Sequence, residues 1–311
     1  MGERIGFTPL TVADRDPIAR LLHRSLVDWY ESRLGQGARF GDRHEPFALF
    51  PEVYEALDPG ECVTARDTSG GIVGVCFSHE RETHVSIGIV ATAPEAAGRG
   101  IAKGMMSLVV EKAARLGKPA RLVSSLLNLD SFSLYSRLGF VPGAIFQDML
   151  VTVPEAGMPT PPPQGVGQVR DATADDVPRI ADLERSLQGI RREKDFSFFV
   201  RNDVGSWRLL VSDGEQRAVR GFLAASVHPS AVMIGPGVAA DEETAVALLW
   251  KALDGLRGRT LVFLAATDAR TLLRTAYGWG ARNIELHVAQ STQPRGGTRG
   301  VVFPTFLPET A

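Results

Sequence analysis

One continuous stretch, residues 84–140, limits what this chain can fold into more than any other part of the sequence. The β-branched run 84–91 predicts a strand. A glycine-bearing loop after it opens into the amphipathic run 103–116, which predicts a helix. The first amides of such a helix have no partner within it and lie at the positive end of its dipole. Because Gly98 and Gly100 carry no Cβ, the main chain can approach an anion closely, and the stretch predicts a phosphate site.

A second group of residues follows this helix in a fixed order. Asn128 comes after the apolar run 122–127, and the segment 131–140 reads Ser-Phe-Ser-Leu-Tyr-Ser-Arg-Leu-Gly-Phe. Together, the two parts resemble the acyl-CoA-binding core of the GNAT superfamily of N-acetyltransferases. The family's loop pattern is Gln or Arg, two residues, Gly, one residue, then Gly or Ala, and it ends here on Gly100-Ile101-Ala102. Ala97 stands where the family usually has Gln or Arg, which removes a side-chain contact but leaves the amides.

The resemblance implies that the cofactor is acetyl-CoA or another acyl-CoA. Its pyrophosphate would bind the loop amides, and its pantetheine arm would pair with the strand before the loop. Gly88 in mid-strand indicates a close backbone approach or a bulge. Asn128, which the family uses to bind the cofactor arm, is also a good helix N-cap, and the two roles are compatible. The predicted cofactor-binding residues are Ile89, Val90, Ala91, Ala97, Gly98, Arg99, Gly100, Ile101, Ala102, Asn128, Ser131 and Tyr135.

Transfer of an acyl group to an amine requires that the amine lose a proton and that the departing thiolate gain one. The resemblance gives Tyr135 the role of general acid, and the alternative is a tyrosine packed in the core with its hydroxyl satisfied. Many relatives carry a carboxylate near the position of Ser86, where this chain has none. His84, Glu80 or His79 could act as the base directly or through a water. All three belong to a predicted hairpin tip, where solvated side chains are the expected alternative.

The acceptor pocket of this superfamily usually involves the first two helices, which fall here within residues 21–54. Asp28 and Tyr30 are the predicted acceptor-binding residues, because a carboxylate and an aromatic ring suit a small polar amine. The alternative is an ordinary amphipathic helix with Leu22 and its apolar neighbours inward and the charges outward.

A Pro- and Gly-rich segment, residues 154–168, cannot join a helix or a central strand and predicts a linker. The segments that begin at Phe7 and Val169 both read strand, acidic cap and helix, which indicates an internal repeat. We therefore predict an α/β fold of two tandem GNAT-like domains, 1–153 and 169–311. Each is expected to be a mixed, mostly antiparallel twisted sheet flanked by helices.

The second copy is predicted to be degenerate. Residues 239–244 read Ala-Ala-Asp-Glu-Glu-Thr in place of the glycine loop, and three carboxylates there would repel a pyrophosphate. Aligning Gly280 with Gly139 places Ala276 where the first copy has Tyr135. Cofactor binding is thus expected in the first copy alone.

Composition narrows the classes of partner and the cellular compartment that we expect for this protein. The chain of 311 residues has a net charge of -2, which favours neither nucleic acid nor an acidic membrane. Cys62 and Cys76 form neither a disulfide framework nor a metal pattern, so we expect a cytoplasmic protein without a metal site. The partner is expected to be a small-molecule or peptide amine acceptor, with the chain a monomer or homodimer.

We expect an acyl-CoA-dependent N-acyltransferase that moves an acetyl group directly to the amine, since no Cys or Ser lies in an activated nucleophile motif. The alternatives are a CoA-binding sensor or scaffold without turnover, and a GNAT-like enzyme with altered chemistry.

Overall fold

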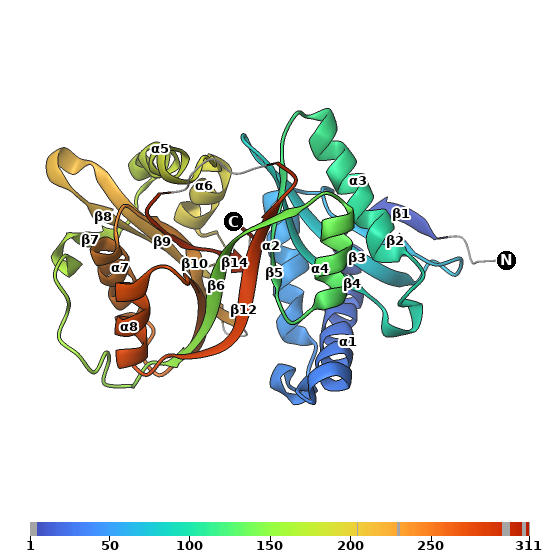
Figure 1. Cartoon of the computed structure of the whole chain (residues 1–311), viewed down its shortest axis with the longest axis horizontal. Coiled ribbons are helices and arrows are strands. Elements are labelled where there is room, and N and C mark those ends of the chain that lie inside the picture. The colour runs from blue at the N-terminus through green and yellow to red at the C-terminus, as the bar shows by residue number, and fades with distance from the viewer. Residues whose placement is uncertain (1–4, 204, 229–230, 294–298, 307–308, 311) are drawn as a thin grey trace. The chain divides into compact units, whose positions relative to one another are not determined.

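The computed structural model describes residues 5–203, 205–228, 231–293, 299–306 and 309–310 (Figure 1). Contacts divide the chain into two compact units, the first made of residues 1–80 and 84–120 and the second of 81–83 and 121–311. The Pro-rich segment forms coil and turns up to a short 3-10 helix at Val166–Gln168, within the second unit. This division differs from the predicted domains 1–153 and 169–311, which concern the internal repeat and stay a prediction.

The first unit is built on an antiparallel sheet in the order β1-β2-β3-β4. The predicted strand 84–91 is confirmed as β4, and the predicted helix 103–116 as α3. In chain order the unit contains β1 (Gly6–Pro9), α1 (Arg15–Leu34), α2 (Leu49–Leu57), β2 (Val63–Arg66), β3 (Ile72–Glu80), β4 (Val85–Thr92) and α3 (Ile101–Arg115).

Close packing of α3 on β3 depends on a glycine. A Cβ on Gly74 would lie 2.9 Å from Ile101 and 3.0 Å from Met105, both buried residues of α3. Absence of that Cβ lets the helix approach the sheet and fixes the start of α3 against the strands. Cys62 and Cys76 are free and buried in this unit. Burial raises the pKa of the Cys76 thiol to about 12.

The second unit contains a larger, mostly antiparallel sheet in the order β5-β12-β6-β11-β10-β9-β8-β7, with β13 paired to β10. Strands β10 and β11 run parallel. In chain order its elements are β5 (Ala120–Ser125), α4 (Leu129–Arg137), β6 (Val141–Thr152), β7 (Val169–Asp171), α5 (Val177–Gln188), α6 (Glu193–Arg201), β8 (Trp207–Asp213), β9 (Val219–His228), β10 (Ala231–Ala239), α7 (Glu242–Asp254), β11 (Thr260–Ala266), α8 (Arg270–Gly278), β12 (Arg282–Ser291), β13 (Val301–Phe303), β14 (Thr305–Phe306) and β15 (Glu309–Thr310).

Strand β12 lies between β5 and β6, and β6 in turn pairs with β11 (Figure 1, where green β6 runs beside red β12). Strands from before and after the Pro-rich segment therefore alternate in one sheet. Phe146 and Met149 of β6 belong to the same hydrophobic core as Leu248 of α7 and Phe263 of β11. This core holds the two parts of the chain together.

Helices α4 and α8 end in the same way, which supports the internal repeat. Phe140 donates its backbone N–H to the carbonyl of Tyr135, and Ala281 donates to Ala276. The glycine before each donor has a φ of +88°, a conformation that favours glycine. Ala276 is buried at the position in α8 that corresponds to buried Tyr135 in α4. Tyr277 is 46% exposed and donates its hydroxyl to Gln147.

The acidic caps at the two predicted openings also match. The backbone N–H of Thr11 donates to Asp14 (2.9 Å), and that of Thr173 donates to Asp176 (2.8 Å). Each carboxylate also accepts from an arginine of a neighbouring strand. The capping boxes thus join each first helix to its sheet.

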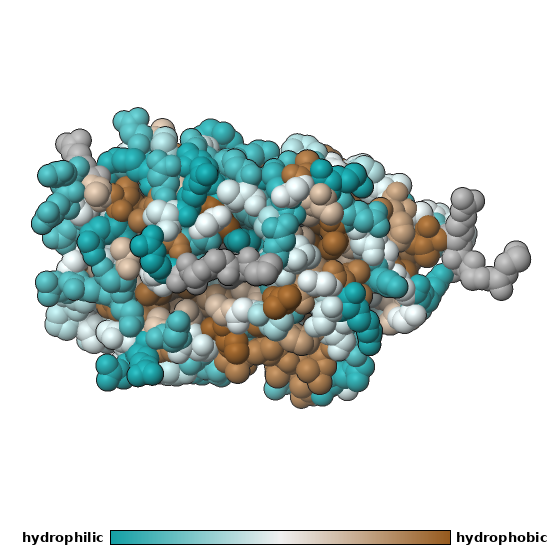
Figure 2. Space-filling view, turned by 45° about the horizontal axis from the view of Figure 1, so that its top comes forward, coloured by the Kyte–Doolittle hydropathy of each residue, from teal (hydrophilic) through white to brown (hydrophobic). Residues whose placement is uncertain are grey.

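The surface shown in Figure 2 is mainly hydrophilic, with hydrophobic residues gathered in places. The exposed large hydrophobic residues include Leu127, Leu129, Val141 and Ile145, around α4 and the start of β6. Within the described residues, no helix combines the length and the hydropathy needed to cross a membrane.

We expect Asp176→Asn to lower the free energy of unfolding by about 3 kcal/mol, because the buried carboxylate holds Arg170 through hydrogen bonds of 2.7 and 2.9 Å. Hydrogen bonding to Arg170 lowers the pKa of Asp176, so this stability is present above the unfolded pKa of about 4 and is lost as the pH falls below it. Urea unfolding from pH 7 to pH 3 tests this. The exposed neighbour Asp175→Asn serves as control, and an equal, pH-independent loss in both variants would contradict the assignment.

Candidate functional site

The loop before α3 has the geometry expected of an anion site. A 3-10 turn at Pro94–Ala96 leads into Gly98 and Gly100, whose φ angles are +75° and +77°, and α3 begins at Ile101. A Cβ built on either glycine would meet no atom within 4 Å, so the main chain is open to a ligand. The first N–H groups of α3 are the unpaired donors of a helix start. The arrangement presents amides and the positive dipole end to solvent.

Strand β4, which feeds this loop, carries the irregularity expected at Gly88. Cys76 pairs with Val90 and Ser78 with Ile87, so β4 has one residue more than β3 between these two pairs. The extra residue falls at Gly88-Ile89, and a bulge there is confirmed. Ile89 and Val90 are half-buried and Ala91 is buried. A bulge turns backbone groups away from the ladder, which leaves them available to a ligand.

Helix α4 carries the second group of predicted residues, within the second unit. The Oδ1 atom of Asn128 accepts a hydrogen bond from the backbone N–H of Ser131 at 3.0 Å, so Asn128 caps the helix. Tyr135 is 7% exposed, and its ring lies 6.0 Å from that of Phe140. Helical spacing places Ser131 and Tyr135 on one face of α4. A role for these residues with the cofactor stays a prediction.

The predicted hairpin is confirmed, since residues 81–84 connect β3 to β4, but the expectation that its histidines are solvated is wrong. His79 and His84 are each 1% exposed. The Nδ1 atom of His79 lies 2.5 Å from Oδ2 of Asp58, and its ring stacks on Tyr54 with the centroids 4.3 Å apart. Both strands extend almost to the turn, so packing against neighbouring elements covers these side chains.

Glu80 is held in an ion-pair group at the end of β3. Its carboxylate accepts from Lys118 at 2.9 Å and lies 3.6 Å from Nζ of Lys112. The hydrogen bond from Lys118 is the main cause that lowers the pKa of Glu80. A lowered pKa makes the carboxylate a weaker base, so this environment does not favour Glu80 in proton abstraction.

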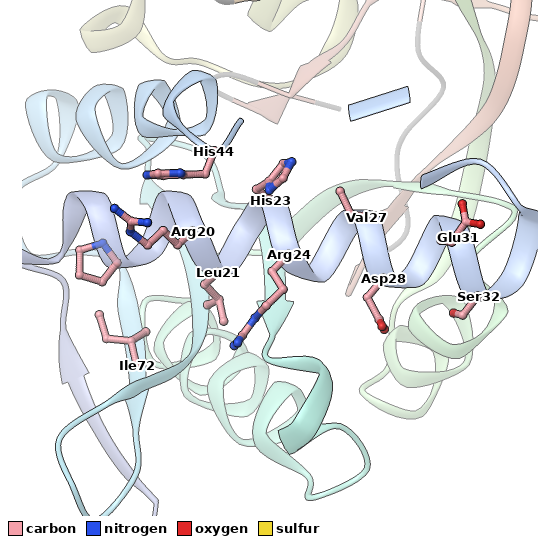
Figure 3. Close-up of a pocket in the computed structure, with 11 residues that line it drawn as sticks. Arg20, Leu21, His23, Arg24, Val27, Asp28, Glu31, Ser32, His44 and Ile72 are labelled. Carbon is pink, nitrogen blue, oxygen red and sulfur yellow. The ribbon is translucent and has the colours of Figure 1, made fainter. Parts of the chain in front are cut away.

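Helix α1 lines a cavity of about 920 Å³ in the first unit (Figure 3). Arg24, Asp28 and Ser32 follow one another at helical spacing and project from the same side of α1. Arg24 donates to Glu95 at 2.8 Å. The carboxylate of Asp28 is exposed and has no hydrogen-bond or ion-pair partner within the part of the chain that the structure describes.

Among the residues that line this cavity, the basic side chains and the carboxylates lie toward different ends. Arg20 and His44 both contact Asp16 at 2.9 Å near the start of α1, while Asp28 and Glu31 lie toward its end. Tyr30, the other predicted acceptor residue, is not among the lining residues. It is buried against Trp29 and Phe40, with the Arg39 guanidinium over its ring at 4.8 Å. The cavity could therefore receive a ligand that carries a positive charge near Asp28.

Comparisons with known proteins agree with the sequence resemblance. Residues 19–140 match the model of the acetyltransferase (GNAT) family. A search of curated proteins finds no significant match. The match begins within α1 and extends past the end of α4, so this part of the chain is similar to a GNAT domain.

Solved structures share the fold over nearly the whole chain. A GCN5-related N-acetyltransferase from Sphaerobacter thermophilus is 18% identical, with a TM-score of 0.63 over 96% of this chain and 98% of that one. A tandem GNAT protein from the clavulanic acid biosynthesis pathway is 14% identical, with a TM-score of 0.58 over 94% and 99%. N-myristoyltransferase of Saccharomyces cerevisiae, solved with myristoyl-CoA, is 10% identical, with a TM-score of 0.61 over 96% and 81%. This chain therefore shares its fold with GNAT proteins, one of which is a tandem GNAT protein.

If the amides of residues 98–102 hold a pyrophosphate, Gly100→Glu should abolish the binding of CoA, because it adds bulk and a negative charge at the anion. Gly117→Glu is a matched control: its φ is +66°, its Cβ also meets open space, and it lies beyond the other end of α3. Calorimetry with CoA measures both. Unchanged affinity in Gly100→Glu would remove the loop from the site, and equal loss in both variants would assign the effect to backbone strain.

Proposed function

We propose that this chain is an acyl-CoA-dependent N-acyltransferase that transfers an acetyl group to the amine of a small molecule or peptide. The observation that carries the proposal is the open glycine loop at the start of α3, which lies within the GNAT domain of residues 19–140. The bulge in β4 supports it, because the strand before the loop has backbone groups turned out of the ladder. Acetyl-CoA is the proposed donor.

The second copy is proposed to bind no cofactor. The Oδ1 atom of Asp241 accepts from the N–H of Thr244 at 2.8 Å, and Glu242 accepts from the N–H of Leu272 at 2.9 Å. These carboxylates occupy donors at the start of α7 and α8 that an anion would need. Burial tends to raise the pKa of Asp241, but hydrogen bonds from Thr244 and Arg220, together with the charge of Arg220, lower it overall and favour the charged carboxylate. A charged carboxylate there would repel a pyrophosphate.

The proposed reaction is a direct transfer. The amine nitrogen attacks the thioester carbonyl carbon, the C–S bond breaks, and the thiolate of CoA leaves. Tyr135 is proposed to donate a proton to that thiolate. Because Glu80 is held by lysines and the two hairpin histidines are buried, the proton of the amine is proposed to leave through water.

Tyr135→Phe should lower turnover by about a hundredfold with little change in CoA affinity, because it keeps the ring and removes the dissociable proton. Steady-state release of free thiol, with an amine chosen from a panel, measures turnover, and calorimetry measures binding. Phe140→Leu tests whether disturbed packing of the same cluster lowers turnover equally. Near-wild-type turnover in Tyr135→Phe would refute its role as the acid. Binding of CoA by the wild type without turnover on any amine would instead favour the sensor or scaffold.

Asp28 is the proposed contact for the ammonium group or a neighbouring amine of the acceptor. Asp28→Asn should raise the KM for the amine about tenfold, the cost of one charge-assisted hydrogen bond, and leave kcat nearly unchanged. Asp42→Asn, an exposed carboxylate of the same unit outside the cavity, is the control. An unchanged KM in Asp28→Asn would exclude this cavity carboxylate from acceptor binding.

A further inference from the structure

A group of three metal-ligating side chains lies in the sheet of the second unit. Asp148 of β6 is paired directly with Glu285 of β12, and His287 follows two residues later. The strand period of two places His287 on the same face as Glu285. One carboxylate oxygen of each acid and one ring nitrogen of the histidine all lie within 4.8 Å of one another. Residues 137 positions apart in the sequence thus meet through strand pairing.

The register of β12 is displaced where these residues lie. Asn283 pairs with Met149 and Glu285 with Asp148, so β12 has one extra residue between these pairs. Between the pairs Val288–Ile145 and Gln290–Pro142, β6 has the extra residue instead, and the original register returns. Two opposite irregularities therefore shift only the short segment 285–288. Without the first one Ile284 would lie opposite Asp148, so the bulge is what places two carboxylates side by side.

Two carboxyl groups and an imidazole meet here in a nearly buried position. Asp148, Glu285 and His287 are 5%, 5% and 6% exposed. Like charges directly across a strand pair repel, and burial removes the water that would screen them. A divalent cation attracts both carboxylates at once, and a neutral imidazole supplies a further ligand. A proton shared within the group is the competing explanation, and it predicts no affinity for a metal.

We propose that Asp148, Glu285 and His287 bind a divalent transition-metal ion, with Zn²⁺ the best fit to two carboxylate oxygens and one imidazole nitrogen. Ligand bonds of about 2 Å place two ligands of one ion about 3–4 Å apart, so small side-chain rotations would close the site. The ion would join β12 to β6, and hence the chain after the Pro-rich segment to the chain before it. The proposal is independent of acyl transfer.

The test uses the full chain without a histidine tag, treated with EDTA and dialysed. Zn²⁺ is titrated by calorimetry, retained metal is counted by elemental analysis, and Co²⁺ serves as a spectroscopic probe. We expect one Zn²⁺ per chain and a higher melting temperature with Zn²⁺ than with EDTA, because metal binds the folded state. Asp148→Asn and His287→Gln should each weaken binding at least tenfold. His228→Gln, at the end of β9 in the same unit, should bind as the wild type does.

Failure of EDTA-treated wild-type protein to bind Zn²⁺ or Co²⁺ at one ion per chain would overturn the proposal. So would binding that Asp148→Asn and His287→Gln leave unchanged, since the metal would then lie elsewhere. If either variant loses its native circular dichroism, the Co²⁺ spectrum of the wild type decides. Visible bands of a site with nitrogen and oxygen ligands support the proposal, and the weak spectrum of aqueous Co²⁺ refutes it. None of these results depends on CoA binding or turnover.

Discussion

Insertion of β12 between β5 and β6 is the interaction on which the second unit depends. It supplies backbone partners to both strands, so neither is an edge there, and β6 pairs with β11 on its other side. Phe146 and Met149 of β6 then pack with the helices and strands of residues 169–311 in one core. Residues 154–168 separate β6 from β11 and β12 in the sequence, while this pairing joins these strands in space. The same pairing carries the buried group of Asp148, Glu285 and His287.

Local features could be predicted from the sequence because their causes are local. Gly98 and Gly100 adopt the positive φ angles that glycines before a helix allow, and Gly88 marks a bulge. The caps at Asp14 and Asp176 follow from residues three positions apart. The turns that end α4 and α8 follow from the glycines at positions 139 and 280. In each case the information lies within a few residues.

Other features depend on tertiary contacts, which the hydrophobic periodicity and the composition of a sequence do not indicate. Alternation tells which residues of a strand share a face, but not which strand is its neighbour, so β12 beside β6 could not be inferred. The group of Asp148, Glu285 and His287 cannot be predicted for this reason, although the sequence shows Asp148 in an apolar strand and Glu285 two positions before His287.

A position beside a turn predicts that His79 and His84 are solvated, whereas tertiary packing buries both.

The position of β12 in the sheet also has a consequence for folding during synthesis. Ser124 of β5 and Gln290 of β12, joined by a side-chain hydrogen bond, are 166 positions apart. Synthesis proceeds from the N-terminus, so β5 and β6 leave the ribosome long before the strand that separates them exists. For that interval the edges that later meet β12 lack this partner, and any pairing of β5 with β6 would have to be undone before β12 could enter. Assembly of this sheet is a late, non-local event, and a nascent chain stalled before residue 282 would be a natural client of chaperones.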